Sequence, residues 1–369
     1  MSDVLKIKKP VEEGITEFLK FLLEKDKVKG IFTLRKTEKT DSFSYSLITD
    51  VEDIKNATPL TPIMPANAGQ LLSSFTLEDA IKEPIAVIIR PCELRAFVEL
   101  TKRIQANMEN IFLISSTCAG VFPLKSTQNG KFSHLLPKYW DAAKKSEVLP
   151  SLRPTCTTCE HFVPDLADII VSVAGNKNLA EECSLHLNTS KGEELAQGAP
   201  GNKTTEKLND VELVKLKESR LKEREKLFAS INDKNLGLAG MVKTFAPCLS
   251  CHGCRQVCPI CFCTLCDFDS KTHEDKVSHY ESELHQKGGA RIPSGTIFFH
   301  TGRMIHMAVS CVNCGMCSDV CPVDIPVATL FSMVGESLQK LFDYLPGRDL
   351  EEPAPCETFI ENEFAGLGE

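Results

Sequence analysis

Two cysteine runs with the same spacing constrain this chain more than any other feature of its sequence. The first extends from Cys248 to Pro259 and the second from Cys311 to Pro322, and both follow the pattern C-x-x-C-x-x-C-x-x-x-C-P. Three close cysteines followed by a fourth before proline is a spacing that binds [4Fe–4S] clusters, and the fourth cysteine ligates the other cluster where two are present. The pattern therefore predicts a unit that holds two clusters and transfers electrons.

This crossed ligation, as in a bacterial-type ferredoxin, assigns four cysteines to each cluster. The ligands of one cluster would be Cys248, Cys251, Cys254 and Cys321, and those of the other Cys311, Cys314, Cys317 and Cys258. The alternative is a pair of zinc sites, because C-x-x-C is also a zinc spacing. Zinc requires neither a third close cysteine nor the following Cys-Pro, so we favour iron–sulfur clusters.

Composition excludes several other classes of protein. A chain of 369 residues has room for two or three domains, and 17 cysteines, an odd number, favour metal ligation over a disulfide framework. The net charge of −8 argues against a nucleic-acid partner. We see no secretory signal and no apolar stretch near the roughly 20 residues needed to span a bilayer, so we expect a cytoplasmic protein without a direct membrane span.

The first half of the chain has the pattern of an α/β domain. Ile85–Ile89 is a continuous apolar run, as expected of a strand covered on both faces, and Cys92 follows it at the start of a predicted helix. A second apolar strand, Ile111–Ile114, precedes Cys118. Ligands collect beyond the carboxyl ends of the strands in such a sheet, so these two cysteines are expected to share a site.

Cysteines outside the paired runs suggest further clusters. Cys156 and Cys159 add a C-x-x-C that would complete a third cluster with the two strand-end cysteines; the alternative is four buried structural cysteines. A tighter group is formed by Cys261, Cys263 and Cys266. These three would bind a fourth cluster with Cys183 as the candidate fourth ligand. The alternative is that they simply pack around the other clusters. Cys356 is unassigned.

The expected fold class is an α/β N-terminal domain followed by a C-terminal α+β domain of the bacterial 2[4Fe–4S] ferredoxin type with helical extensions. The expected boundaries are an α/β domain at 1–202, a charged helical linker at 203–240, a ferredoxin-like domain at 241–345 with an insert at 267–295, and a tail at 346–369. We interpret the linker as an exposed helix with a solvated face, in preference to one that docks a partner. The polar part of the insert, 270–291, is interpreted as a surface hairpin or loop.

The continuation of the first run, Cys258-Pro-Ile-Cys-Phe-Cys-Thr-Leu-Cys266, resembles the β subunit of deazaflavin-linked formate dehydrogenases, which is related to the β subunit of the deazaflavin-reducing hydrogenase. Other matching stretches are Arg90-Pro-Cys-Glu-Leu-Arg-Ala96, Ser116-Thr-Cys-Ala-Gly120, Ile292-Pro-Ser-Gly295, Cys321-Pro-Val-Asp-Ile-Pro326 and Tyr344-Leu-Pro-Gly347. The resemblance implies that electrons pass from a molybdenum- or tungsten-containing catalytic subunit along the clusters to FAD. The flavin would then exchange a hydride with the deazaflavin.

The chain departs from that family where the flavin is expected. Residues 11–16 lack the usual cysteine and paired glycines, and the stretch after Asp168 lacks the usual Gly-Trp, since Trp140 is the only tryptophan. Glycines there allow close approach of the backbone to a ligand, so FAD is doubtful. If flavin binds, Asn67 and Gly69 are the expected contacts.

Three hypotheses follow. The favoured one is an iron–sulfur electron-transfer β subunit of a formate dehydrogenase- or hydrogenase-type complex, which passes electrons between a catalytic subunit and a carrier such as a heterodisulfide-reductase-like flavoprotein. The second is an FAD-containing deazaflavin oxidoreductase subunit, and the third a non-catalytic redox sensor or interaction protein. His252 and His306 lie near the cysteine runs, but no acid–base pair or activated nucleophile is apparent, so we predict no catalytic residue.

Overall fold

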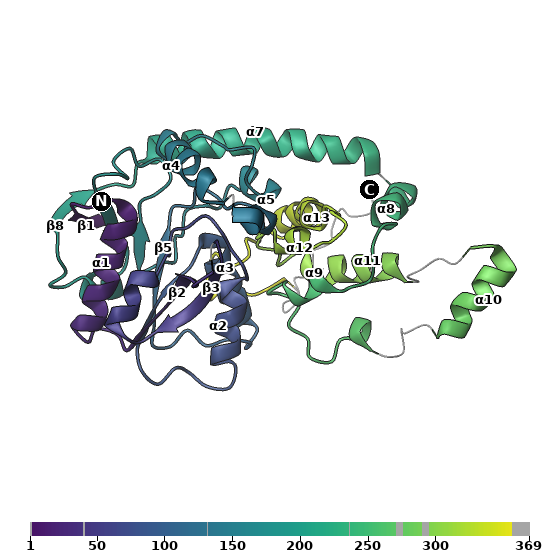
Figure 1. Cartoon of the computed structure of the whole chain (residues 1–369), viewed down its shortest axis with the longest axis horizontal. Coiled ribbons are helices and arrows are strands. Elements are labelled where there is room, and N and C mark those ends of the chain that lie inside the picture. The colour runs from purple at the N-terminus through teal and green to yellow at the C-terminus, as the bar shows by residue number, and fades with distance from the viewer. Residues whose placement is uncertain are drawn as a thin grey trace.

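The structure, a computed structural model, describes residues 2–39, 41–130, 132–235, 237–270, 276–289 and 295–355. The first half is built on one eight-stranded sheet with the order β3-β2-β4-β5-β6-β7-β1-β8 (Figure 1). Its strands are β1 (Ser2–Ile7), β2 (Gly30–Lys36), β3 (Phe43–Ile48), β4 (Ile85–Ile88), β5 (Ile111–Ser116), β6 (Ile169–Val171), β7 (Cys183–Leu187) and β8 (Asn202–Glu206). The adjacent strands β2, β4, β5 and β6 are parallel, and antiparallel strands flank them.

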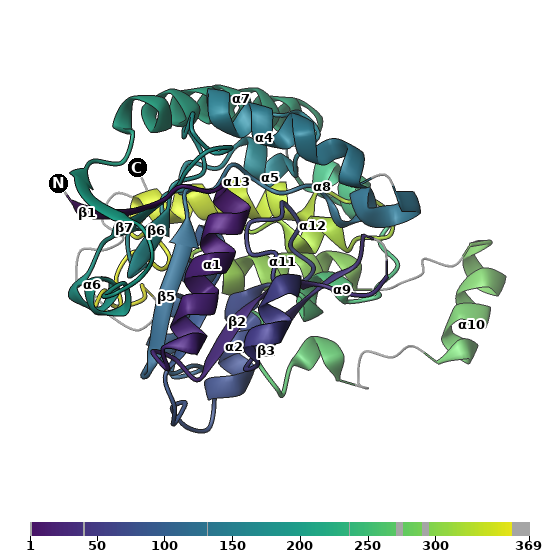
Figure 2. The same ribbon diagram turned by 60° about the vertical axis from the view of Figure 1, so that its left-hand side comes forward.

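Helices cover both faces of this sheet. They are α1 (Val11–Glu24), α2 (Ala68–Thr76), α3 (Pro91–Lys102), α4 (Leu136–Lys145), α5 (Pro154–Thr157) and α6 (Ser190–Leu195). Ala86 and Ile88 of β4 face the core beneath α1, whereas Ile85 and Val87 face the core beneath α2 and α3. Figure 2 shows α1 in front of the sheet, beside β5. The prediction that this apolar strand is buried on both faces is confirmed.

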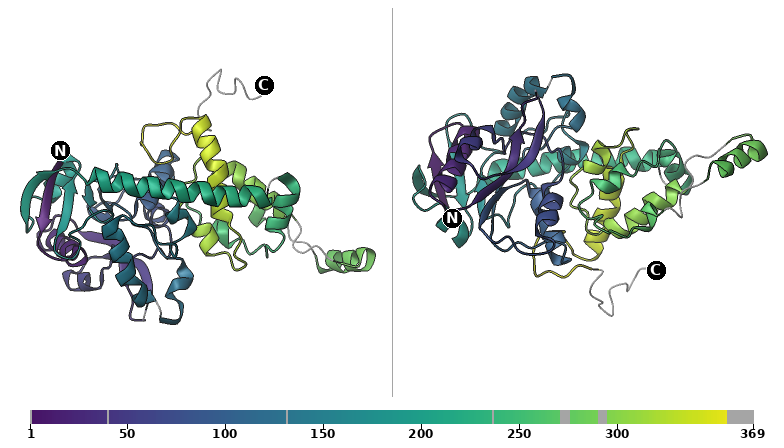
Figure 3. Two further views of the ribbon diagram at one scale, coloured as in Figure 1. Left: turned by 90° about the horizontal axis from the view of Figure 1, so that it is seen from above. Right: turned by 60° about the horizontal axis from the view of Figure 1, so that its bottom comes forward.

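The helix α7 (Asp210–Asn235) runs from the α/β domain towards the C-terminal domain (Figure 3). It is more than an exposed linker, because Leu213 and Leu216 belong to the core and Arg220 is only 1% exposed. The predicted linker segment also begins inside the sheet, since β8 extends to Glu206. Because charged residues dominate this segment, the sequence does not reveal that one side of the helix is buried.

In the C-terminal domain, the regular structure of the described residues is helical, in keeping with the predicted helical extensions. Its helices are α8 (Gly237–Phe245), α9 (Gly253–Gln256), α10 (Val277–Lys287), α11 (Thr296–Met307), α12 (Met316–Asp319) and α13 (Val327–Leu341). The core contains Phe245, Ile260, Met307 and Phe331, with cysteines packed around it. Across 2–355, apart from the gaps given above, no helix is both long and apolar enough to cross a membrane.

The insert was predicted as a hairpin or loop, which is wrong for its middle part. The segment Val277–Lys287 forms α10, which contains neither glycine nor proline and ends at Gly288 in the left-handed conformation (φ 66°). This helix stands away from the rest of the chain in Figures 1 and 3. Residues 271–275, 290–294 and 356–369 lie outside the described residues, so part of the insert, most of the tail, Cys356 and most of the stretch at 292–295 are not placed.

A buried arginine links the two domains. The Arg153 side chain is 1% exposed, and its Nε donates to Asp319 Oδ2 at 2.8 Å. Its Nη2 donates to the carbonyl oxygen of Met64 at 2.9 Å, and its Nη1 to that of Cys314 at 3.3 Å. Because these partners come from both domains, the guanidinium holds the α/β domain against the second cysteine run.

The segment after α13 folds back onto α3. The Tyr344 hydroxyl donates to the buried carboxylate of Glu99 at 2.6 Å, and the backbone N–H of Gly347 donates to the same oxygen at 2.8 Å. Arg95 Nε donates to the carbonyl oxygen of Pro346 at 2.7 Å. The last described segment of the chain therefore forms a second connection between the domains.

Candidate iron–sulfur centres

Four cysteines from the α/β domain surround one small cavity, called here the N-terminal site. Cys92 lies at the start of α3 directly after β4, Cys118 follows β5, Cys156 lies in α5 and Cys159 just beyond it. All four line a cavity of about 30 Å³. Because β4 and β5 are parallel, their carboxyl ends lie at the same edge of the sheet. The structure thus brings together the four cysteines predicted to share a site.

Permanent positive charge adjoins this cavity. Arg90 and Arg220 line it and are 6% and 1% exposed. Arg220 reaches in from α7, donates to the carbonyl oxygens of Cys118 at 3.2 Å and Cys159 at 3.4 Å, and lies over the ring of Phe162. A guanidinium remains charged in proteins, so both arginines offset the negative charge of thiolates at this buried place.

Burial makes these thiols poor candidates for free reactive cysteines. It raises the pKa of Cys156 to about 11 and that of Cys92 well above the ordinary value for a thiol. The thiolate is the form that binds iron, and metal binding displaces the proton. A buried cysteine with a raised pKa therefore suits a metal ligand, whose charge is shared with the cluster, better than a free nucleophile.

A second cavity of about 30 Å³ lies in the C-terminal domain, and its cysteines are called here the inner set. They are Cys258, Cys311, Cys314 and Cys317. Three of them belong to the second run, and Cys258 is the fourth cysteine of the first run. The fold therefore brings together the crossed combination that the spacing predicts, and four thiols around a small cavity suit a cubane cluster.

The outer set contains the other four cysteines of the paired runs. Burial raises the pKa of Cys254 to about 11, and the neighbouring thiols of Cys248, Cys251 and Cys321 contribute to the same rise. Cys254 is buried, whereas Cys251 is exposed. The outer set is the remaining half of the predicted crossed assignment, and its exposed Cys251 lies at the protein surface.

Within the described ranges, no group of three or more His, Cys, Asp or Glu side chains is arranged to hold a metal ion. A cubane does not require thiolates to converge on one ion, because each of its four irons binds a different cysteine. The N-terminal site and the inner set surround a volume in this way. They are also neighbours, because Asn313 and Cys314 line both cavities.

Comparisons with known proteins agree with this geometry. A family model described as a 4Fe-4S dicluster domain matches residues 244–325. F420-dependent formate dehydrogenase subunit beta of Methanocaldococcus jannaschii is 26% identical, with 92% of this chain and 93% of the relative covered. F420-dependent formate dehydrogenase 1 subunit beta of Methanococcus maripaludis is 30% identical, with 92% of each covered. This chain belongs to the family of formate dehydrogenase β subunits.

The family resemblance predicted from the cysteine runs is thereby confirmed. Among solved structures, a chain of the F420-reducing [NiFe] hydrogenase complex from Methanosarcina barkeri overlaps 65% of this chain and 94% of its own length. The TM-score of that overlap is 0.44 and the sequence identity is 18%.

The remaining group of cysteines in this β-subunit family member, Cys261, Cys263 and Cys266, lies near an arginine. Arg255 Nη2 donates to the carbonyl oxygen of Cys263 at 2.8 Å, and its guanidinium pairs with Asp269. Cys183 does not lie with this group. It begins β7, is fully buried in the core of the α/β domain and packs against Gly14 of α1. Cys183 is therefore not the fourth ligand of Cys261, Cys263 and Cys266.

The two residues predicted as flavin contacts have packing roles. The buried Asn67 caps α2, where its Oδ1 accepts from the backbone N–H of Gln70 at 3.3 Å. A Cβ on Gly69 would lie 2.5 Å from the carbonyl oxygen of Glu93 and 2.8 Å from the backbone nitrogen of Phe97. Both residues thus serve the close packing of α2 on α3. The buried Nδ2 of Asn67 has no hydrogen-bond partner among the described residues.

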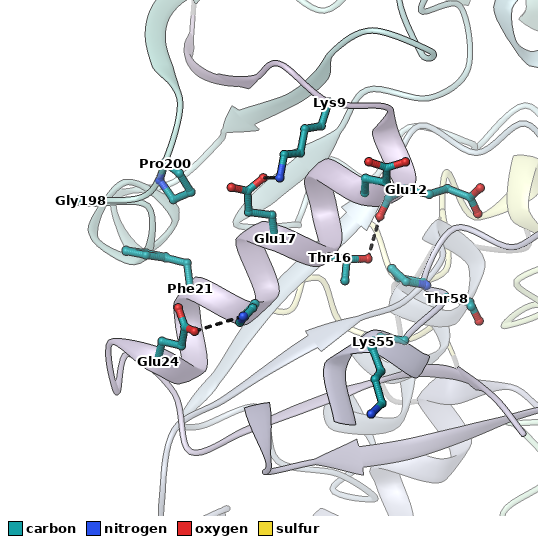
Figure 4. A pocket seen from close by; sticks show the side chains of 14 residues that line it. Lys9, Glu12, Thr16, Glu17, Phe21, Glu24, Lys55, Thr58, Gly198 and Pro200 are labelled. Atoms are coloured by element: carbon teal, nitrogen blue, oxygen red, sulfur yellow. Dashed lines mark hydrogen bonds and ion pairs between the residues drawn. The ribbon is translucent and has the colours of Figure 1, made fainter. Parts of the chain in front are cut away.

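The largest cavity by volume that we describe, about 880 Å³, lies on the outer side of α1. Figure 4 shows the charged side chains that line it, and several of these pair with each other. Lys9 pairs with Glu17 at 2.9 Å, and Lys20 with Glu24 at 3.4 Å. Its lining contains no cysteine, so its size does not connect it with the clusters.

Sequence reasoning missed the charged and aromatic side chains around the cysteines. Of the two histidines considered, His306 is exposed, and His252 pairs with Asp269 at 3.2 Å. The histidine in contact with a predicted ligand is His300, whose Nε2 lies 3.4 Å from Cys248 Sγ and whose ring stacks on Phe245. No local signal identified it, because its contact joins residues 52 positions apart in the chain.

Proposed function

We propose that this chain relays single electrons through three [4Fe–4S] clusters. The ligands would be Cys92, Cys118, Cys156 and Cys159 at the N-terminal site; Cys258, Cys311, Cys314 and Cys317 in the inner set; and Cys248, Cys251, Cys254 and Cys321 in the outer set. The observation that carries this proposal is that the first two cavities share Asn313 and Cys314. Clusters carry electrons one at a time, and neighbouring clusters can pass them on.

The contacts around each set support one order for the proposed relay. The inner set occupies the middle position because it adjoins the N-terminal site through Cys314 and the outer set through Arg303, which lines the inner cavity and contacts Cys254. The outer set reaches solvent at Cys251, so it provides an exposed end for exchange with another protein. The relatives' name supports a formate dehydrogenase-type catalytic subunit as one partner of the relay.

A second candidate function is hydride exchange with a deazaflavin through a bound flavin. The name of the relatives and one cavity favour it. This cavity, about 540 Å³, is large enough for a small molecule, and Arg95, His161 and Phe162 contribute to its lining. His161 and Phe162 also line the N-terminal site. A redox ligand in this cavity would adjoin the N-terminal end of the relay.

The experiment that separates these functions is anaerobic purification, with iron, acid-labile sulfide and flavin measured per chain. Three clusters correspond to about 12 irons, and the paired runs alone to about eight. About 16 irons would add a cluster at Cys261, Cys263 and Cys266. Stoichiometric flavin would support the second candidate. Bound zinc with negligible iron would contradict both functions.

A further inference from the structure

Arg303 lies between the inner and outer sets and contacts both. It belongs to α11 and is 2% exposed. Its Nη1 donates to Cys254 Sγ, a ligand of the outer set, at 3.2 Å, and its Nη2 donates to the carbonyl oxygen of the same residue at 3.1 Å. The same side chain lines the cavity of the inner set beside Cys258. One guanidinium therefore faces the sulfur ligands of two proposed clusters.

The charge of Arg303 is not assigned to a carboxylate. Two other buried arginines pair with an acid, Arg153 with Asp319 and Arg255 with Asp269, whereas Arg220, like Arg303, contacts cysteines. Among the described residues, no ion pair with an acid is formed by Arg303. A buried charge is costly unless it is paired, so the negative groups available to this guanidinium are the cysteine thiolates.

Two aromatic rings hold the guanidinium in place. Its central carbon lies 5.5 Å from the centre of the Phe299 ring and 5.0 Å from that of Phe331. These rings come from α11 and α13, so the position of the charge is determined by the packing of two helices. A charge held this way keeps the same place as the electron moves and needs little reorganisation.

We propose that Arg303 raises the reduction potentials of the inner and outer clusters together by holding one permanent positive charge between them. This inference rests on the ligand assignments of the proposed function. Each reduction adds one electron to a cluster, and a nearby positive charge stabilises the added negative charge. The same charge offsets the repulsion between electrons on the two clusters. Arg303 is thus a positioning residue whose charge favours the reduced state of the inner and outer clusters.

The test is a redox titration, monitored by electron paramagnetic resonance, of the purified chain and of Arg303→Gln. The neutral variant should lower the midpoint potential of both clusters. At a fixed solution potential, the ratio of reduced to oxidised outer cluster should fall on the order of tenfold, which is about 59 mV for a one-electron couple. The inner cluster should shift in the same direction but less, because the direct hydrogen bond is to Cys254.

Arg303→Lys and Lys340→Gln are the matched controls. The lysine variant keeps the charge, so it should restore both reduced-to-oxidised ratios to within about threefold of the original protein. Lys340 lies on α13 with a side chain 72% exposed. Because water screens its charge, Lys340→Gln should leave the midpoint potentials of both clusters unchanged. Iron content is measured for each variant.

The outcomes are distinguishable. If the unmodified protein shows no cubane signals, the ligand assignments themselves fail. If those signals are present and Arg303→Gln keeps its iron but shifts neither potential, or Arg303→Lys shifts them as far as Arg303→Gln, the charge is not the cause and only this inference is overturned. Loss of iron from both Arg303 variants would also overturn it, since Arg303 would then serve only to hold the cysteines.

Discussion

The two domains hold their cysteines in different ways. In the α/β domain, the N-terminal site is assembled from positions between 92 and 159, and strands buried on both faces bring them together. In the C-terminal domain, each run forms its own turns. Ser250 and Asn313 occupy equivalent positions with φ of 48° and 57°, and His252 and Gly315 do so with φ of 54° and 81°. One site depends on the whole fold, whereas the paired runs carry much of their geometry locally.

The two runs nevertheless differ in what surrounds them. The ring of His252 stacks on that of Phe299, a residue of the same domain, with 4.3 Å between the ring centres. At the equivalent position, a Cβ on Gly315 would lie 2.3 Å from Thr155 Oγ1 of the α/β domain. At this position only the second run contacts the α/β domain, whereas the first run reaches that domain at Gln256, whose carbonyl oxygen accepts from Gln70 Nε2 at 3.1 Å. This distinction between local and fold-dependent construction predicts substitution effects of different size.

The largest effect is expected at the fold-dependent site. Cys156→Ala should remove about four irons, which is one cluster, while the signals of the paired runs remain, because the substitution leaves both runs intact. Iron analysis and electron paramagnetic resonance of the anaerobic protein measure this. The matched control is Cys183→Ala, which removes a cysteine of the same domain from the apolar core and should leave iron content unchanged. Unchanged iron in Cys156→Ala would mean that Cys156 is not a ligand.

The next largest effect concerns the buried ion pair that joins the domains. Asp319→Asn keeps the size of the side chain but leaves Arg153, 1% exposed, without its carboxylate. Breaking a buried pair from one side should lower the free energy of unfolding by about 3–5 kcal/mol. Urea unfolding under anaerobic conditions, followed by the fluorescence of Trp140 in the α/β domain and by cluster absorbance, measures the loss. A change below about 1 kcal/mol would show that the interface does not depend on this pair.

A smaller effect is expected from Gly315→Ala. The alanine would adopt φ of 81° and place its Cβ against Thr155, so strain and overpacking together should lower the stability by about 1–3 kcal/mol. Gly315→Ala combined with Thr155→Gly should recover the overpacking part, which isolates the domain contact from backbone strain. If the second substitution restores nothing, strain alone accounts for the loss. The two runs would then be equivalent in this respect.

The same distinction explains which parts of the molecule could be predicted from the sequence. The crossed cysteine sets and the strand at 85–88 were predictable because spacing and apolar runs are local properties. Arg220 and Arg303 were not, since an arginine in a charged or mixed helix has the same local pattern whether it faces water or a buried cysteine. Cys183 was misplaced for a related reason. A cysteine count carries no information about which core a side chain enters.

The smallest effect is expected at an exposed ion pair of the same interface, which serves as the reference for the buried pair of Arg153 and Asp319. Lys125 and Asp324 form an ion pair at 3.4 Å between the same two domains as Arg153 and Asp319, but their side chains are 69% and 83% exposed. Asp324 has φ of 53°, and asparagine tolerates that conformation as well as aspartate does, so Asp324→Asn changes the charge without new backbone strain. Its effect on unfolding should be about 0–1 kcal/mol and should vanish as salt is raised, because the Debye length falls to about 3 Å at 1 M. The Asp319→Asn effect should persist in the same salt, since its partner is shielded from solvent. If both substitutions weaken equally with salt, the interface is wetter than the structure indicates, and burial is not what separates these two pairs.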